Sequence, residues 1–285
     1  MGKTAANVQQ LKESVFAVVG DDGLTNFGII KGTDGSAVLI DADIRRMDEI
    51  DDALTKAGCS RVRYLVNTHE NFDHSSANHY FEKNGAVVIG TEGCWQALKE
   101  DGDAKFAEMA GRSPELWERF PDLKMGNLQI TFPQELTLQL PGVAVRLLFA
   151  AHNGKSHSRG DAIAIVDEDR ILFAGDLLYT DYHPVTVYGN IPNWIQSINK
   201  LVKQNFVTVV PGHGPVSSGG NDAYKQAFVK FRAYLEDFHQ KLTDLKAGKT
   251  SPADVESSMK SGDYAGMGKT WMVKRNIEYF LKEAD

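Results

Sequence analysis

The sequence predicts an α/β protein, and two features lead to this expectation. Short apolar, β-prone runs alternate with segments in which apolar residues recur at steps of three and four. Several of the apolar runs stop abruptly at His, Asp and Gly residues, as strands do when they deliver functional groups at their carboxyl ends. A chain of 285 residues is long enough to bury a substantial core in one large domain.

In the first ninety or so residues, glycine- and aspartate-rich turns separate the apolar runs. Gly58 favours a helix end at that point, and Ser75 or Ser76 is suited to cap the start of a helix that runs to about Lys83. We therefore predict strands at 14–19, 26–31, 37–41, 62–67 and 86–89, and helices at about 46–57 and 75–83.

The middle of the chain begins with a stretch, 91–125, that reads as helices and loops and is interpreted as an insertion near the functional site. A helix predicted at 191–203 has its apolar residues on one face, which is typical of core packing. The apolar runs predict strands at 128–132, 136–140, 143–148, 162–166, 171–174 and 206–210.

The C-terminal part is predicted to be helical. From Tyr224 to Leu245, aromatic and aliphatic residues recur at steps of three and four, which indicates a long amphipathic helix that packs on the domain or on a partner subunit. A further helix is predicted at about 271–283. We divide the chain into a domain of residues 1–220 and a helical extension of residues 221–285, and the aromatic helix face is compatible with a homodimer.

Composition narrows the classes of function. A net charge of −7 argues against nucleic acid as the main partner, and no run approaches the ~18 apolar residues of a membrane span. Cys59 and Cys94 form no C-x-x-C pair, so a cysteine zinc knuckle is excluded and no disulfide framework is implied. No signal peptide is recognised, and the compartment stays open between the cytoplasm and, if a leader has been removed, the periplasm. We expect a small-molecule substrate.

Four stretches that follow apolar runs carry the residues of interest. Imidazole and carboxylate groups together are the ligands that suit zinc and neighbouring first-row metals. Small residues beside them let the backbone approach closely. The residues are His69, Asp73 and His74 after the first run, His157 in a polar glycine-containing loop, and Asp176 and His213 after two later runs.

These stretches resemble the signature of the metallo-β-lactamase-fold hydrolase superfamily, which reads H-x-H-x-D-H, then a G-H-S-x-G-D-like loop, then G-D and P-G-H-G. The resemblance covers roughly residues 14–215. It implies a four-layer αββα sandwich with a metal site along one edge, between the two sheets. The helical C-terminal extension lies outside the resemblance.

The resemblance also implies a set of metal ligands. An Asp at position 176 favours the hydrolase and lactonase branches over the β-lactamases that have Cys there. The implied first site consists of His69, Asn71 and His157, the second of Asp73, His74 and His213, and Asp176 bridges both ions or serves one of them.

One position departs from the signature, because Asn71 stands where the second His is expected. An amide oxygen is neutral and is a weaker zinc ligand than imidazole, so the first site should hold metal less tightly. We expect one firmly held zinc ion, either alone or with a second ion bound weakly; a full pair of ions and the use of iron are the alternatives.

The expected activity follows from the metal. Zinc lowers the pKa of its bound water from 15.7 toward roughly 7 and so provides hydroxide, which Asp73 is suited to orient or to deprotonate. The hypothesis is a zinc-dependent hydrolase that acts on an ester, lactone, thioester or β-lactam-like amide. The groups predicted to orient the imidazoles are His152, Ser158, Asp161 and Glu70.

The loop that follows Asp176 is expected to overhang the site, and Tyr179, His183 and Tyr188 are its predicted substrate contacts. The alternative for these three side chains is ordinary packing within a lid. His79 and His239 lie on predicted helices and are interpreted as structural.

Two other classes of function remain open. One is a diiron redox protein, although the chain lacks an attached flavodoxin-like domain. The other is a catalytically degenerate member that acts by binding, in which Asn71 marks the loss of the first metal. A nuclease is disfavoured by the acidic composition.

Overall fold

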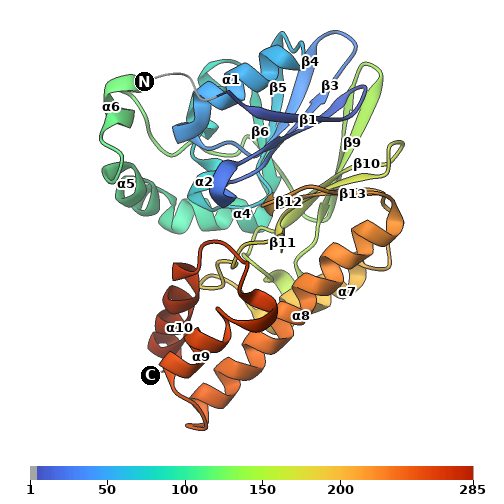
Figure 1. Cartoon of the computed structure of the whole chain (residues 1–285). Helices are drawn as coiled ribbons and strands as arrows, with labels where there is room; N and C mark the ends of the chain where they lie inside the picture. Colours follow the sequence, from blue (N-terminus) through green and yellow to red (C-terminus); the bar gives the residue numbers. More distant parts are fainter. Residues whose placement is uncertain (1–4, 285) are drawn as a thin grey trace.

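The computed structural model describes residues 5–284 and shows two β-sheets stacked between helices (Figure 1). The first sheet has seven strands in sequence order: β1 (Asn7–Lys12), β2 (Val15–Val19), β3 (Phe27–Lys31), β4 (Ser36–Ile40), β5 (Arg61–Val66), β6 (Val87–Thr91) and β7 (Ile130–Phe132). Strands β1 to β4 pair antiparallel, and β4 to β7 pair parallel.

The second sheet has six strands and is antiparallel except for one pair. Strand β11 runs parallel to β12, so their carboxyl ends lie at the same edge. The spatial order is β13 (Ser217–Ser218), β12 (Thr208–His213), β11 (Ile171–Tyr179), β10 (Ala162–Val166), β9 (Val143–Phe149) and β8 (Glu135–Leu140).

The helices follow the strands or connect them. The first half contains α1 (Met47–Lys56), α2 (Phe72–Ser75), α3 (Asn78–Lys83), α4 (Glu92–Ala97), α5 (Asp103–Gly111) and α6 (Glu115–Arg119). The second half contains α7 (Ile191–Leu201), α8 (Asn221–Lys246), α9 (Pro252–Ser258) and α10 (Trp271–Ala284). Short helical turns are η1 (Asp21–Gly23), η2 (Ile44–Arg46), η3 (Leu98–Gly102), η4 (His152–Gly154) and η5 (Gly262–Tyr264).

Three hydrophobic clusters define the layers. One lies between the first sheet and its outer helices and includes Leu39 and Ile50. A second lies between the two sheets, where Val38 of the first sheet and Val145 of the second are both fully buried. The third lies between the second sheet and α7, α8 and the C-terminal helices. Three apolar interfaces separate four layers, so the predicted αββα sandwich is confirmed.

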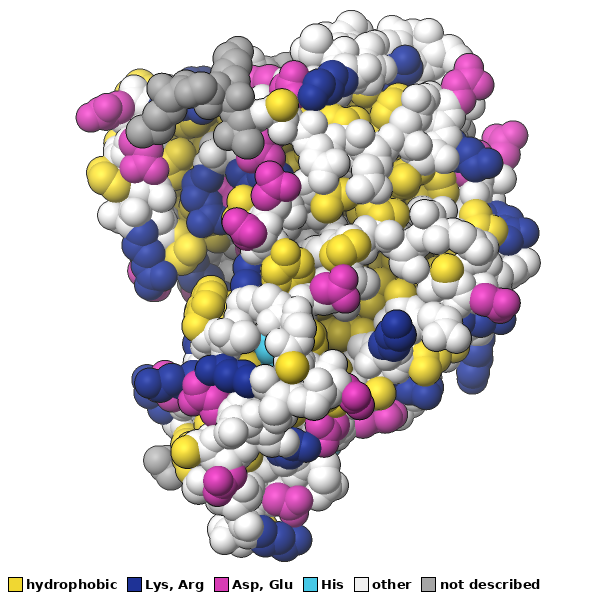
Figure 2. Space-filling view, viewed as in Figure 1, with side chains coloured by type: hydrophobic (Ala, Val, Ile, Leu, Met, Phe, Trp, Pro, Cys, Tyr) yellow, Lys and Arg dark blue, Asp and Glu magenta, His cyan; other side chains and the backbone are white. Residues whose placement is uncertain are grey.

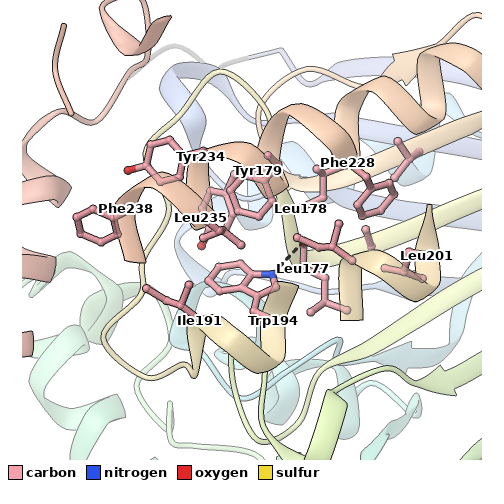
Figure 3. Close-up of a cluster of buried hydrophobic side chains, with 14 of the residues drawn as sticks. Leu177, Leu178, Tyr179, Ile191, Trp194, Leu201, Phe228, Tyr234, Leu235 and Phe238 are labelled. Atoms are coloured by element: carbon pink, nitrogen blue, oxygen red, sulfur yellow. Dashed lines mark hydrogen bonds between the residues drawn. The ribbon is translucent and has the colours of Figure 1, made fainter. Parts of the chain in front are cut away.

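The third cluster joins the C-terminal helices to the sandwich. Figure 3 shows Trp194 of α7 among side chains from β11 and α8, and its indole nitrogen donates a hydrogen bond to the carbonyl oxygen of Leu177 at 3.1 Å. Tyr179 and Leu235 lie in the same cluster. The aromatic face of α8 is therefore covered within the chain itself. The division of the chain at residue 220 and a homodimer stay predictions.

The predicted strands are all present, with three corrections. Strands β1 and β13 and helix α9 were not predicted, because their sequences are too polar or too short to show a clear period. The helix expected at 75–83 is divided into α2 and α3. Strand β11 continues to Tyr179, so Asp176 lies inside a strand and not beyond its end. Gly175, at φ +51°, interrupts the pairing with β12 and turns Asp176 inward.

In the face shown in Figure 2, charged side chains are scattered among polar and hydrophobic ones, and Lys and Arg side chains lie near an exposed histidine edge. None of the helices formed by residues 5–284 is both long and apolar enough to cross a membrane.

Candidate metal centre

The predicted metal residues come from five segments that meet at one edge of the sandwich. His69 lies in the loop after β5, and Asp73 and His74 lie on the short helix α2 that ends this loop. His157 lies in the loop before β10, Asp176 on β11, and His213 at the last position of β12. Parallel pairing of β11 and β12 places their carboxyl ends side by side, so Asp176 and His213 lie at the same edge of the second sheet.

Asp176 is the centre of the arrangement, and its two carboxylate oxygens face different imidazoles. Its Oδ2 lies 3.6 Å from Nε2 of His69 and 3.3 Å from Nε2 of His157. Its Oδ1 lies 3.2 Å from Nε2 of His74 and 3.3 Å from Nε2 of His213. Oδ2 of Asp73 lies 3.7 Å and 3.5 Å from the same two nitrogens of His74 and His213. The side chains therefore form two adjacent groups.

Two sets of three residues could each hold a metal ion. The ligand atoms of His69, His157 and Asp176 all lie within 4.8 Å of one another, and so do those of Asp73, His74 and His213. Within the described chain, His69 Nε2, His74 Nε2 and Asp176 Oδ1 are buried without any hydrogen-bond partner. Buried polar atoms without partners are costly, and cations held by the two sets of residues would satisfy all three. The residues present therefore fit a metal ion.

The outer nitrogens of three imidazoles are held by partners that the sequence analysis did not identify. Nδ1 of His74 lies 2.9 Å from Oδ2 of Asp41, and Nδ1 of His213 donates to the carbonyl oxygen of Gly23 at 2.8 Å. Nδ1 of His69 lies 3.1 Å from the hydroxyl of Thr68. These contacts direct Nε2 of each ring toward the candidate centre.

The four groups that were predicted to orient the imidazoles form hydrogen bonds within or to the loop that carries His157, and not to the imidazole rings. Asp161 accepts hydrogen bonds from the backbone nitrogen of Ser158 at 2.9 and 3.0 Å and from its hydroxyl at 2.8 Å. Glu70 accepts from the backbone nitrogen of Arg159 at 3.3 Å. These bonds shape the loop that carries His157. The backbone nitrogen of His152, at the start of that loop, donates to the hydroxyl of Ser156 in the loop and to that of Ser197 on α7.

Asn71 lies at the group formed by His69 and His157. Its side-chain nitrogen is 3.1 Å from Nε2 of His157, and a half-turn of the terminal amide would present the oxygen at the same place. The Asn71 amide therefore lies beside the group that contains His157.

Burial and mutual charge set the ionisation of the group. Burial lowers the pKa of His157 to about 4 and that of His69 well below its usual range, so both rings are neutral and able to bind metal. Burial raises the pKa of Asp176, but the surrounding imidazoles, His213 first, hold it well below its usual range. Burial also lowers the pKa of His74, yet carboxylates, Asp176 first, raise it well above 6.5.

The three predicted substrate contacts lie in different surroundings. The hydroxyl of Tyr179 donates a hydrogen bond to Asp176 Oδ2, and its ring stacks on His213 at 4.8 Å. His183 is fully buried, and its Nδ1 lies 2.9 Å from the hydroxyl of Tyr234 on α8. The partly exposed ring of Tyr188 lies 5.0 Å from the Lys105 ammonium. Tyr179 thus joins the metal group, and the other two side chains join the packing around it.

The predicted insertion at 91–125 borders this site. The ring of Phe106 on α5 lies 5.5 Å from that of Phe72 on α2, next to Asp73. Glu100 forms an ion pair with Arg159 at 2.8 Å, in the loop that carries His157. The insertion therefore contacts two of the segments that supply candidate ligands.

A surface cavity of about 490 Å³ lies elsewhere, between the second sheet and α7. Its lining includes Leu148 of β9, Ile163 of β10 and Ser197 of α7, and contains none of the candidate ligands. This cavity is on the helix-covered face of the sheet and is separate from the metal residues.

Solved structures include several with a similar fold, whereas comparison with curated protein sequences gave no match. A metallo-beta-lactamase from Pontibacter korlensis has a TM-score of 0.63 at 18% identity and covers 81% of this chain and 99% of its own. The DIM-1 metallo-beta-lactamase exposed to ceftazidime has a TM-score of 0.59 at 17% identity, with 81% and 100% covered.

A third neighbour extends over the C-terminal helices. A double mutant of the sec-alkyl sulfatase PisA1 has a TM-score of 0.69 at 13% identity and covers 98% of this chain, which spans 50% of that protein. Identities this low support the fold alone. The family model described as the metallo-beta-lactamase superfamily matches residues 20–213, more than half of the sequence. With the sandwich and the His/Asp centre, this match shows that the chain belongs to the metallo-β-lactamase superfamily.

Proposed function

We propose that the chain is a zinc-dependent hydrolase that uses water to cleave an ester, a lactone, a thioester or a β-lactam-like amide. The observation that carries the proposal is the position of Asp176, with one oxygen toward His69 and His157 and the other toward His74 and His213. A buried carboxylate shared between two pairs of imidazoles is suited to bridge two neighbouring cation positions.

The ligands are assigned by their neighbours. His69, His157 and one oxygen of Asp176 would hold one ion, with the Asn71 amide beside it. Asp73, His74, His213 and the other oxygen of Asp176 would hold the second. Zinc is supported by the ligand set, because imidazole nitrogens and carboxylate oxygens are its usual partners alongside thiolate. The second position has more charged ligands and would hold zinc more firmly.

Asp73 is the proposed catalytic residue. A bound zinc ion supplies a water of lowered pKa, toward about 7, and a Lewis acid for the substrate's carbonyl oxygen. The Asp73 side chain is 30% exposed, whereas the other His and Asp candidate ligands are at most 5% exposed, so Asp73 is the more open to substrate and water. Its Oδ2 accepts a hydrogen bond from the Thr25 hydroxyl at 2.6 Å. Burial raises the Asp73 pKa, but His74 and His213 lower it more, so the carboxylate is ionised and can accept the water's proton.

Metal content tests this proposal directly. Protein purified without chelators and then supplied with limiting zinc should retain about one tightly held ion per chain, because Asn71 weakens the first position. Elemental analysis would measure it, and a panel of a nitrophenyl ester, a lactone, a thioester and a chromogenic β-lactam would report hydrolysis. Iron in place of zinc, or no metal, would contradict the proposal.

A pair of variants tests whether Asp73 is needed for hydrolysis. Asp73→Asn should lower the hydrolysis rate of any accepted substrate at least ~100-fold, since it removes the proton acceptor. Asp263→Asn, an exposed position of the C-terminal extension, is the matched control and should change nothing. Equal rates for the two variants would exclude Asp73 as the catalytic residue.

A further inference from the structure

The C-terminal extension supplies a side chain to the candidate site from outside the residues that the family model matches. The segment before α10 pairs with the loop that follows β11. The backbone nitrogen of Gly268 donates to the carbonyl oxygen of Asp181 at 2.8 Å, and that of His183 donates to the carbonyl oxygen of Gly268 at 3.1 Å. Lys269 follows directly, at φ +54°, a conformation that side-chain-bearing residues rarely adopt.

A second contact fastens the same loop to α10. Asn276 is buried, and its side chain donates to the carbonyl oxygen of Pro184 at 2.8 Å and accepts from the backbone nitrogen of Thr186 at 3.0 Å. The ring of Tyr182 lies against both Gly23 and Gly268, at distances that leave no room for a side chain at either glycine. Lys269 is therefore held in place relative to the loops of the site.

The ammonium group of Lys269 lies beside the metal group. It donates a hydrogen bond to the carbonyl oxygen of Gly23, the same oxygen that accepts from Nδ1 of His213 at 2.8 Å. Asp73 and Asp176 are close enough to raise the Lys269 pKa, although burial lowers it more. One carbonyl oxygen thus separates this cation from a candidate metal ligand.

Lys269 is distinguished from the other cations nearby by its lack of a counter-charge. Arg45 makes a two-pronged hydrogen-bonded pair with Asp43, and Arg46 pairs with Glu49 at 2.6 Å. For Lys269, residues 5–284 place no carboxylate oxygen within 4.0 Å of the ammonium nitrogen. An ammonium has three donors, and the contact with Gly23 uses one of them. Two donors on a half-buried cation remain for another acceptor.

We propose that Lys269 binds an anionic group of the substrate, such as a carboxylate, while the bond to be cleaved lies at Asp73 and Asp176. This inference rests on the proposed hydrolase function and narrows it to substrates that carry an oxyanion beside the hydrolysed group. A lysine whose only task is to tie two loops together would be a poor choice, because the backbone carbonyl of Gly23 neutralises none of its charge.

A pair of metal-binding probes tests the role of Lys269 without a known substrate. The thiolates 3-mercaptopropionate and 3-mercaptopropionamide have the same length, and only the first has a carboxylate. Isothermal titration of the zinc-loaded full chain should show that the carboxylate probe binds about 10-fold more tightly than the amide, the usual size of one charge-assisted hydrogen bond. Zinc content is measured on the same samples.

Three variants complete the test. Lys269→Met keeps the length and the backbone cost of the side chain and should reduce the preference for the carboxylate to about 1, with the amide bound as before. Lys269→Arg should keep most of the preference. Lys274→Met, which removes an exposed lysine of α10 with a 3.8 Å contact to Glu278, is the control and should match the parent.

The possible outcomes separate a failure of the Lys269 proposal from a failure of the hydrolase proposal. An unchanged preference in Lys269→Met, or an equal loss of affinity for both probes, would overturn the role of Lys269 and leave the hydrolase proposal intact. A parent protein that contains no zinc, or that binds neither thiolate when loaded with it, would overturn both.

Discussion

The hydroxyl of Tyr179 donates a hydrogen bond to Oδ2 of Asp176, the carboxylate oxygen that faces His69 and His157. The same tyrosine ring stacks on His213, which faces the other oxygen of Asp176. Burial, followed by the charge of Asp176, raises the pKa of Tyr179 well above its usual range, so the hydroxyl keeps its proton and remains a donor. Tyr179 therefore fixes the orientation of the carboxylate at the centre of the site.

The variant Tyr179→Phe should weaken zinc binding about 10-fold, because groups that hold a metal ligand in place typically contribute that much. Competition with a fluorescent chelator would measure the dissociation constant. The control is Tyr224→Phe, which removes a hydroxyl buried in the same hydrophobic cluster and bonded to the carbonyl oxygen of Leu201 at 2.7 Å. Both variants should lose about 1–2 kcal/mol of stability, and equal zinc affinities would exclude the role of Tyr179.

Asn71→His should convert the weak position into a tight one. The amide lies 3.1 Å from His157, and an imidazole there would add a strong ligand beside His69. Titration with zinc should then show two tightly held ions per chain in place of one. Asn71→Ala is the control and should retain the single tight ion. Two tight ions in the parent protein would show that the amide already serves as an adequate ligand.

Asp41→Asn should lower zinc affinity by about 10- to 100-fold. Asp41 Oδ1 accepts from the backbone nitrogen of Thr68 at 2.7 Å, and Oδ2 faces Nδ1 of His74 at 2.9 Å. With the amide oxygen kept on Thr68, the amide nitrogen would face Nδ1–H of His74, and two donors cannot bond. The ring would have to turn or change tautomer.

The control for Asp41 is Asp167→Asn, which breaks an exposed pair with Arg146 on the far side of β9 and β10. Its zinc affinity should equal that of the parent. Competition with a chelator would measure the zinc affinity of both variants. An Asp41→Asn protein with unchanged zinc affinity would show that His74 needs no carboxylate at its Nδ1.

His183 should make the protein less stable in mild acid. Burial lowers its pKa to about 4 in the folded protein, whereas the unfolded chain titrates near 6.5. Between those values the unfolded state binds the proton and the folded state does not, so stability is lost as the pH falls from about 6.5 to 4. Above 6.5 the group has no effect.

The measurement is the urea midpoint at pH 7 and pH 5, for the parent and for His183→Gln. The parent should lose more stability between the two pH values than the variant does, because glutamine does not titrate. The difference between the two proteins isolates His183 from the other buried histidines. Identical losses would show that the ring of His183 is protonated in the folded protein as readily as in the unfolded chain.

The fold and the residues that meet in the candidate centre were largely predictable from the sequence, for a physical reason. Strand β4 is a buried apolar run, β5 ends in the buried pair Leu65 and Val66, and the polar residues of the site follow the two strands. Asp41 was included in a predicted strand, but nothing in its neighbours indicates that it lies behind His74, 33 residues away. A contact between distant segments depends on the packing of the two sheets, which no local pattern records.

The same limit explains His183 and Lys269. His183 lies in the predicted lid, but its partner Tyr234 is on α8, so only the packed structure shows that the ring turns toward the extension. Lys269 lies in an irregular, polar segment without a period, and its proximity to His213 arises from backbone pairing between residues 181–183 and 268. The motifs identified the candidate ligands, and only the tertiary packing shows which groups lie behind them.

Gly212, which precedes His213 in the fourth motif, packs directly against Asp176. A side-chain carbon at Gly212 would lie 2.0 Å from Oδ1 of Asp176 and 2.8 Å from the backbone of Gly175. Neither neighbour is free to retreat, because Asp176 is held by Tyr179 and Gly175 belongs to β11. Gly212→Ala should therefore cost about 1–3 kcal/mol of stability and displace the carboxylate from His74 and His213. Zinc binding should be lost when the carboxylate is displaced.

The control is Gly111→Ala, at the end of α5, where no atom lies within 4 Å of the added carbon. Thermal unfolding and zinc content would be measured together, and a Gly212→Ala protein that retains its zinc would show that Asp176 is not a ligand.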